Sequence, residues 1–336
     1  MIETENIKYG IGINADYSVL ALDTRKVEND SIDCVGESVA RDIKQVDIGI
    51  QNNFLFSYIA ENVKNTISIC IDKDTPVFPI DIKAKADTAV AHIQIIIKKG
   101  IKTTIHEQIT NKNFVGIIID LQVEEGADVT YIADQRCNDD TYTIALRRAF
   151  VHKNAKIKWI DIAIGGAIAN STMYTLLDES GVVGETYGLF YGTDEQLHDI
   201  SHTTVHRSSY TKSILKTNGV LDNKSKAIYR SLIDIRENAF NADGQQKEET
   251  LLLSRDAHVS SVPDLQIANS EVTCSHGVST RNIDEQTLFY FFSRGIDREV
   301  ARHAILDGHL SVILDMIEDD SIILRVADAI MQTYDT

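Results

Sequence analysis

From about Ala84 to Leu265 the sequence alternates between short β-type runs and small polar turn clusters, without helical periodicity between them. The turn clusters include EEGAD at 124–128, HKNAK at 152–156 and DNKSK at 222–226. Short strands that recur at regular spacing, with polar corners and no helices between them, favour either a β-solenoid or a β-sandwich. This pattern predicts a mainly β core.

Several of these runs begin in the same way, with a small residue, one spacer and an aliphatic residue. The examples are Ala127-Asp128-Val129, Ala155-Lys156-Ile157, Gly181-Val182-Val183 and Ala257-His258-Val259. Such a loose internal repeat, with small residues at the corners, favours the solenoid over the sandwich. We therefore predict an N-terminal mixed α/β segment over 1–83, a β-helix core over 84–280 and a helical segment over 281–336.

Composition excludes several classes of protein. With 336 residues and 43% hydrophobic content, the chain has ample material for a large core, and it holds no apolar run long enough for a membrane span. The start MIETENIKYG lacks the pattern of a secretory signal, so we expect a cytoplasmic protein. The net charge is −17 and residues 231–336 carry 8 Lys+Arg against 19 Asp+Glu, which argues against nucleic-acid binding.

The stretch from Asn269 to Ile296 holds the first candidate site. Val272, Cys274 and His276 recur at every second position, which predicts a strand with all three on one face until Gly277 interrupts it. Cys274 and His276 would then lie roughly 6–7 Å apart at Cα, close enough to act on one soft metal ion or sulfur species. The alternative is a buried pair with a packing role, because free cysteine is commonly buried.

The period then changes to about 3.6, which predicts helices after the strand. Asp284 is expected to cap the first helix and Gly295 to end it, with an apolar stripe at Leu288, Phe291 and Phe292. A second helix would begin after Asp297 and break at Gly308. Two further apolar stripes follow, at Val312, Ile313, Met316 and Ile317 and at Ile322, Ile323, Val326 and Ile330. These helices would either cap the solenoid end or dock a partner.

The run CSHG at 274–277 and the helix LFYFFSRGI that follows resemble the C-terminal signature of the SufB/SufD family, the scaffold subunits of SUF iron–sulfur cluster assembly. The similarity extends through NGVLDNKSKAIYRSLIDI at 218–235 and back to about Tyr131. It implies a right-handed parallel β-helix and a non-enzymatic scaffold with a transient iron–sulfur cluster, for which Cys274 and His276 would be ligands. It also implies SufC as partner, an ABC-type ATPase that docks on the C-terminal helices. The chain itself carries no phosphate-binding loop.

The resemblance also gives Cys137 a role. In SufB-type members a cysteine before a similar aspartate–threonine–tyrosine stretch receives sulfur from the desulfurase system, and Asp140-Thr141-Tyr142 follows Cys137 here. From the residues alone we expect Cys137 in a polar loop, where Arg136 would lower the thiol pKa and Asp139 and Asp140 would oppose that shift. The alternative is an ordinary, partly exposed thiol.

Two departures from the SufB pattern are visible. Counted from Pro263, a position that holds cysteine in SufB-type members is Ile267 here, and Gly277 replaces a glutamate after the signature histidine. These SufD-like features beside a SufB-like Cys137 suggest an undifferentiated member that works as a homodimer, or pairs with a paralogue, through an open strand edge at Val259–Val278. They also leave open a structural subunit that docks the ATPase and holds no cluster.

Two other sets of residues were weighed. His198, His202 and His206 are spaced by four, but β-type neighbours predict a strand, on which the three would spread over roughly 25 Å. A structural role is therefore expected, and the resemblance to the SufB/SufD family, through its pattern D-x₆-H, implies Asp199 as the acidic partner of His206. A solenoid carbohydrate-active enzyme would need paired carboxylates such as Asp194 and Asp199, and usually an aromatic-rich groove. The 7% aromatic content argues against that class.

Overall fold

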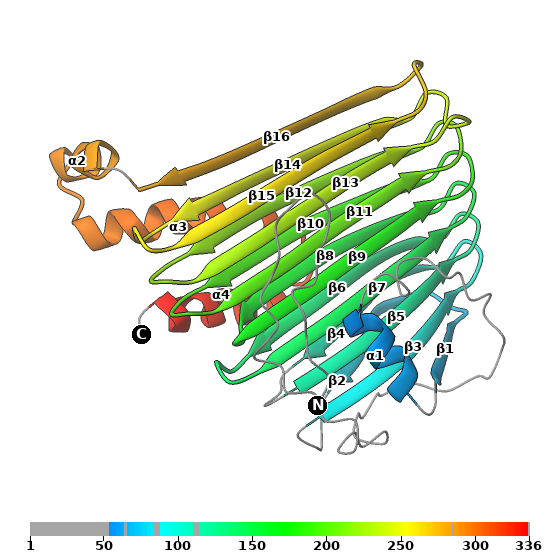
Figure 1. The fold of residues 1–336 in the computed structure, drawn as a ribbon, viewed down its shortest axis with the longest axis horizontal. Helices are drawn as coiled ribbons and strands as arrows, with labels where there is room; N and C mark the ends of the chain where they lie inside the picture. The colour runs from blue at the N-terminus through cyan, green and yellow to red at the C-terminus, as the bar shows by residue number, and fades with distance from the viewer. Residues whose placement is uncertain (1–53, 64–65, 83–87, 110–113, 284, 335–336) are drawn as a thin grey trace.

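The computed structural model describes residues 54–63, 66–82, 88–109, 114–283 and 285–334. Successive strands alternate between two parallel sheets of eight strands each, so the chain winds as a flattened β-solenoid (Figure 1). Thr88 pairs with Phe114 and Lys226 with His258, so one coil takes between 26 and 32 residues. The parallel β-solenoid predicted from the sequence is confirmed.

The odd-numbered strands form the first sheet: β1 (Thr66–Ile71), β3 (Thr88–Ile97), β5 (Phe114–Val123), β7 (Tyr142–Val151), β9 (Ile168–Leu177), β11 (Leu197–His206), β13 (Lys226–Ile235) and β15 (His258–Ile267). The even-numbered strands form the second: β2 (Thr75–Ile82), β4 (Lys102–Ile109), β6 (Asp128–Cys137), β8 (Lys156–Gly165), β10 (Val183–Gly192), β12 (Lys212–Leu221), β14 (Asp243–Leu252) and β16 (Thr273–Asn282). The helices are α1 (Phe54–Asn62), α2 (Glu285–Ser293), α3 (Arg298–Leu314) and α4 (Asp320–Tyr334).

The small residues at the predicted corners are buried where one strand turns into the next. Ala127 and Ala155 are each 1% exposed, and each closes a tight turn with a backbone hydrogen bond to the residue three positions earlier. Gly126 and Asn154 stand just before them with positive φ, which such a turn requires. The strands β1 and β2 precede residue 84 and belong to the same sheets, while the three-part domain division stays a prediction.

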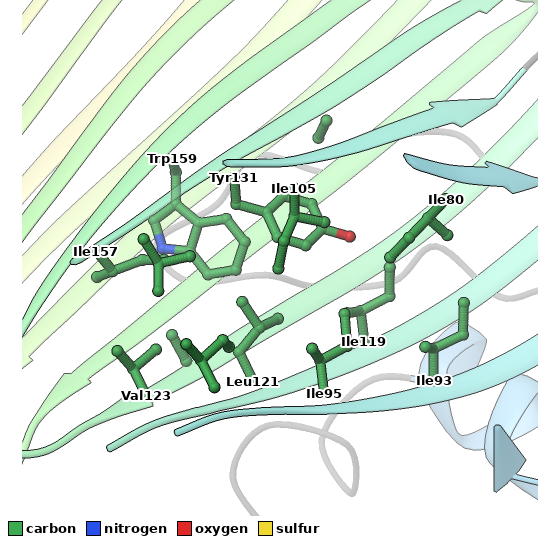
Figure 2. Packing of buried hydrophobic residues seen from close by; sticks show 14 of the residues in the cluster. Ile80, Ile93, Ile95, Ile105, Ile119, Leu121, Val123, Tyr131, Ile157 and Trp159 are labelled. Carbon is green, nitrogen blue, oxygen red and sulfur yellow. The ribbon is translucent and has the colours of Figure 1, made fainter. Parts of the chain in front are cut away.

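Apolar side chains fill the space between the two sheets in the first coils. Tyr131 and Trp159 lie in this core with their ring centroids 5.0 Å apart, among the isoleucines that Figure 2 labels. The indole of Trp159 is fully buried and donates to Thr175 Oγ1 at 3.0 Å. A buried aromatic residue of this size contributes on the order of 3–5 kcal/mol to stability by truncation.

The C-terminal helices α3 and α4 lie on the outer face of the even-numbered sheet (Figure 1). Leu310 and Ile313 of α3 and Val326 of α4 are buried against outward-facing residues of β6, β8, β10 and β12. These helices therefore cover a sheet face, and the alternative in which they cap the solenoid end does not hold for them. Asp297 caps α3 as predicted, with its carboxylate accepting from Glu299 N–H at 2.9 Å.

Two details of the helix prediction were wrong. The helix α3 continues through Gly308, because the buried Leu306 and Leu310 on either side of it hold the helix on the sheet. In α2, Leu288 is buried, but Phe292 is 68% exposed because the short helix extends past the sheet. The predicted cap Asp284 lies outside the described residues. Among the helices that the structure describes, none is both long and apolar enough to cross a membrane.

Candidate functional site

The last coil, formed by β15 and β16, is the end of both sheets and carries the predicted pair. Among the residues that the structure describes, each of these strands has a neighbour on one side only in its sheet, and no described strand pairs with its second edge. The strand β16 runs through Gly277 to Asn282, contrary to the predicted break. Glycine is tolerated there because no further coil packs on it and its position opens to free space.

Cys274 and His276 both lie on the inward side of β16. They are in register with Gly244 and Gln246 of β14, which are buried between the sheets. The sulfur of Cys274 is half-buried beside Leu265 and Ile233, and burial raises the pKa of its thiol. The free thiol is therefore protonated at neutral pH, and a metal ion must displace that proton to bind.

A buried acid that the sequence did not single out lies beside this pair. Glu248 is 1% exposed on the inward side of β14, two residues along from Gln246. Ser261 Oγ donates to its Oε2 at 2.9 Å and Thr250 Oγ1 donates to its Oε1. Burial raises the pKa of Glu248, against the lowering effect of these two hydroxyls. The period-two burial of β14 could have identified it, since Lys247 and Glu249 point to the other side.

Ile267, which stands where SufB-type members have a cysteine, lies at this same end. It is paired with the buried Ile235 and is itself 46% exposed, because no coil covers it. An isoleucine here supplies no ligand. The chain thus brings one thiol and one imidazole to the inward side of its last coil.

Cys137 has a different environment from the predicted one. It is the last residue of β6, half-buried, with its sulfur 3.5 Å from Thr143 Oγ1 and 3.9 Å from the carbonyl of Ile109. The Arg136 guanidinium points to the other side of the strand, where it donates to Asp134 at 2.7 Å. The loop position and the arginine beside the thiol were therefore wrong predictions, because β6 continues four residues past position 133, where the predicted run ended.

Cys137 and Cys274 are far apart. Their strands β6 and β16 are five steps apart in one sheet, or about 24 Å at roughly 4.8 Å per step. Cys137 ends its strand whereas Cys274 is near the start of its own, which adds to the separation. The two thiols cannot bind one ion within a single chain.

The three histidines lie on β11 with their rings inside the solenoid, as the strand prediction implied. His202 Nε2 is 3.0 Å from Asp161 Oδ2, and His206 contacts the hydroxyls of Thr211 and Ser213 at 2.8 Å. His198 is fully buried with both ring nitrogens unpartnered, and stacks on Phe190. Their structural role is supported by these contacts.

The acidic partner predicted for His206 was wrong. Asp199 lies on the outer face of β11 and accepts from Arg230, because positions three and ten of a strand point to opposite sides. Asp194 is exposed on a turn with positive φ. These two acids do not form the paired carboxylates of a glycosidase.

A buried charge network in the middle of the solenoid was also missed. Arg147 donates to both carboxylate oxygens of Glu107, at 2.6 and 2.7 Å, and to Ser171 Oγ at 3.0 Å. Ser171 in turn donates to Asp161 at 2.9 Å. The two partners of Arg147 are 24 and 40 residues away from it in sequence, so only the length of each coil could have revealed them.

The helix α2 exposes aromatic side chains next to the last coil. Phe289, Tyr290 and Phe292 are 69%, 57% and 68% exposed, and the Arg294 guanidinium lies 5.3 Å from the Tyr290 ring centroid. A shallow depression of about 410 Å³ lies between Leu288, Phe289, Phe292 and Arg298. Adjacent exposed aromatic residues of this kind are typical of protein-binding surfaces.

Within the residues that the structure describes, no three His, Cys, Asp or Glu side chains already converge tightly enough to hold a metal ion. Cys274 and His276 are therefore two donors of an incomplete site. A partner molecule, a second copy or a side-chain rotation would have to supply the rest.

Comparison with known proteins matches the family model "SUF system FeS cluster assembly, SufBD core domain" to residues 80–309. An "iron-sulfur cluster assembly SufBD family protein" of Staphylococcus epidermidis is 25% identical over 193 residues, which cover 57% of this chain and 42% of that protein. A relative of the same description in Staphylococcus haemolyticus is 24% identical over 201 residues, 60% of this chain and 43% of the relative. The chain thus aligns with less than half the length of these relatives.

Proposed function

The chain belongs to the SufBD family of iron–sulfur cluster assembly proteins, and from that premise we propose that it is a scaffold subunit on which iron and sulfide are assembled into a transient cluster. The scaffold itself performs no catalysis; ATP hydrolysis belongs to a partner, and the work takes place in the cytoplasm. The observation that carries the proposal is the placement of Cys274 and His276 on the inward side of the open last coil.

The chemistry of the pair suits this role. Thiolate and imidazole are ligands that iron–sulfur clusters accept, and the redox potential and lifetime of a cluster depend on such mixed ligation. His276 is exposed and Cys274 half-buried, so iron and sulfide can reach both from the open end. A transient cluster also suits an incomplete ligand set, because fewer protein ligands hold it less tightly.

Anaerobic reconstitution with iron and sulfide tests the proposal. Cys274→Ser and His276→Ala should each lose most of the visible absorption and bound iron of the wild type. Two matched variants control for generic effects: Cys70→Ser on β1, at the other end of the solenoid, and His258→Ala on the outer side of β15. Equal iron and sulfide retention by Cys274→Ser, His276→Ala and the wild type would refute the site.

Assembly with a second copy through the last coil would complete the ligand set. The unpaired edges of β15 and β16 offer backbone hydrogen bonds to another strand, and a two-fold axis there would bring two Cys274/His276 pairs together. A paralogue could take the place of the second copy. Light scattering should give a dimer at micromolar concentration, and a monomer without any added paralogue would contradict the homodimer.

Cys137 is the proposed acceptor of sulfur, as a persulfide, from a cysteine desulfurase system. Its half-buried sulfur lies at the end of β6, and the neighbouring Gly166 carries no side chain that could cover it. Mass spectrometry after incubation with a desulfurase should find the added sulfur on Cys137 and not on Cys70. Labelling on another cysteine alone would refute this assignment.

The helix α2 is the proposed contact for a SufC-like ABC-type ATPase. The helices α3 and α4 already bury their apolar sides on the sheet, whereas α2 leaves Phe289 and Phe292 exposed. Replacing both by Ser should abolish co-purification with the ATPase. Leu324→Ser, an equally exposed apolar residue on α4, should leave it intact. Unchanged co-purification after replacement of both phenylalanines would mean that the contact is elsewhere, and equal loss in both variants would mean that α2 is not the specific contact.

The second candidate is a structural subunit that docks the ATPase and holds no cluster. Ile267 favours it, because the position supplies no thiolate. This candidate predicts that the wild type, like Cys274→Ser, retains no iron after reconstitution while it still binds the ATPase. Reconstitution and co-purification together therefore distinguish the two functions.

A further inference from the structure

The inward side of the last two coils offers acceptors and no permanent cation. Lys247 and Arg281 are the only Lys or Arg residues in the strands β14, β15 and β16, and both occupy outward positions. The inward side of the same strands presents the Gln246 amide, the Glu248 carboxyl and His276. An arrangement of this kind attracts a positive ion and has nothing of its own to neutralise it.

Glu248 and Glu107 occupy similar positions in the solenoid but have different partners. Each acid is the sixth residue of its strand and points between the two sheets, and the exposed fractions of Glu248 and Glu107 are 1% and 0%. Glu107 is held by the two-pronged ion pair with Arg147, whereas the contacts of Glu248 are the hydroxyls of Thr250 and Ser261. Because an unpaired buried carboxylate is costly, Glu248 is expected to ionise only when a cation arrives.

A second buried group also lacks a partner. The side-chain oxygen of Gln246 makes no hydrogen bond within the described structure although the residue is 4% exposed; its amide nitrogen donates to the Asp264 carbonyl at 3.3 Å. Gln246 is in register with His276, directly beneath it in the solenoid. This oxygen is therefore an acceptor that is available to a cation or a donor at the site.

We propose that Glu248, with the side-chain oxygen of Gln246 and the imidazole of His276, binds the ferrous iron that enters the last coil. The inference rests on the proposed function for the identity of the ion, and adds a metal-binding residue to it. Glu248 and Gln246 supply oxygen donors and His276 supplies a nitrogen donor, a set that suits Fe²⁺ and other divalent transition-metal ions. Cys274 is four residues before Val278, the register partner of Glu248, or roughly 13 Å along the strand, so its sulfur does not bind the same ion.

The register permits this arrangement. Glu248 is two residues along from the register partner of His276, and such diagonal neighbours lie roughly 7–8 Å apart, within reach of long side chains. The two side chains do not converge in the free protein. His276 is exposed and has no neighbouring coil above it, so a rotation of its side chain can bring the imidazole to an ion held at Glu248.

Anaerobic titration of the full chain with Co²⁺, which reports its ligands by visible absorption, tests the proposal. Glu248→Gln keeps the size of the side chain and its hydrogen-bonding capacity, and should weaken Co²⁺ binding by at least about tenfold. Glu249→Gln is the matched control, since Glu249 is the next residue, points outward and pairs with Lys247. It should bind Co²⁺ within about twofold of the wild type.

Three results would overturn the proposal: equal Co²⁺ affinity of Glu248→Gln and the wild type, an equal loss in both glutamate variants, or no stoichiometric binding by the wild type. Urea unfolding of Glu248→Gln verifies that the variant is folded. Failure of the proposed function is recognised separately, by reconstitution of Cys274→Ser. If cluster formation depends on Cys274 but Co²⁺ affinity does not depend on Glu248, the proposed function stands and Glu248 is not a ligand. If Co²⁺ affinity depends on Glu248 but cluster formation does not depend on Cys274, only the proposed function is rejected.

Discussion

Replacing Arg147 by Met should destabilise the protein strongly, because it removes the cation from the buried network inside the solenoid. The guanidinium is 1% exposed and its nitrogens are 2.6 and 2.7 Å from the two carboxylate oxygens of Glu107. Burial alone would lower the pKa of Arg147, but the adjacent Glu107 carboxylate raises it above its usual value. The guanidinium is therefore charged at every accessible pH.

The magnitude follows from what the variant leaves behind. Glu107 is 0% exposed, and after the change its carboxylate keeps the Tyr131 hydroxyl at 2.6 Å as its remaining side-chain contact from this network. Breaking a buried ion pair from one side costs about 3–5 kcal/mol, because the other charge remains buried without compensation. A domain with roughly 5–15 kcal/mol of stability would lose a large share of it.

Equilibrium urea unfolding at neutral pH, followed by circular dichroism, measures this loss. The double variant Glu107→Gln/Arg147→Met removes both charges and should recover at least about half of the lost stability. Glu125→Gln breaks the exposed pair of Glu125 with Lys99 and should leave the urea midpoint unchanged.

A loss below about 1 kcal/mol in Arg147→Met would refute the reasoning, since it would mean that water reaches Glu107. So would a double variant less stable than Arg147→Met, because the removed carboxylate would then have been favourable without its partner. A change in the slope of the unfolding free energy against urea concentration would indicate that the variant is no longer compact. The stabilities would then be compared through the double-mutant cycle of Glu107 and Arg147.

Two further variants test the interior. Burial lowers the pKa of His198 to about 4, from about 6.5 in the unfolded chain. The folded state is therefore fully stable above pH 6.5 with respect to this group and loses up to about 3 kcal/mol of stability as the pH falls from 6.5 towards 4. Between neutral pH and about pH 4.5 the urea midpoint of His198→Phe should therefore fall less than that of the wild type. Gly219→Ala should lower the melting temperature by at least about 4 °C in a thermal scan, because its added Cβ would lie 1.9 Å from Cζ of Phe190, whereas Gly277→Ala, with open space around it, should not.

The solenoid was predictable because its signals are local. Strands such as β6 and β8 begin with alternating burial over their first four residues, and small residues such as Ala127 and Ala155 mark the corners where the chain reverses. The interior partners were not predictable, because the coil length varies between 26 and 32 residues. One residue of error in that offset reverses the side of every strand that follows, so Arg147 could not be matched to Glu107 from the sequence.

The wrong breaks have one physical origin. Glycine was taken as a stop signal at Gly277 and Gly308, yet the cost of glycine in an element is only about 1 kcal/mol. At Gly308 the burial of Leu306 and Leu310 on the sheet exceeds that cost, so α3 continues. Tertiary packing decides such cases, and it is invisible in a local window of sequence.

The coil structure also explains why the candidate site lies at the end of the solenoid. In the middle coils an inward-facing charge is enclosed by coils on both sides, and the acids Glu107 and Asp161 are accordingly paired with Arg147 and His202. In the last coil one side is open, so donors such as His276 remain reachable by an ion while Glu248, one coil deeper, is still shielded from water. A cation that binds there gains the strong electrostatics of the interior without having to cross it. If a further strand covered β16, Glu248 would need an internal cationic partner, as Glu107 and Asp161 do in the coils below.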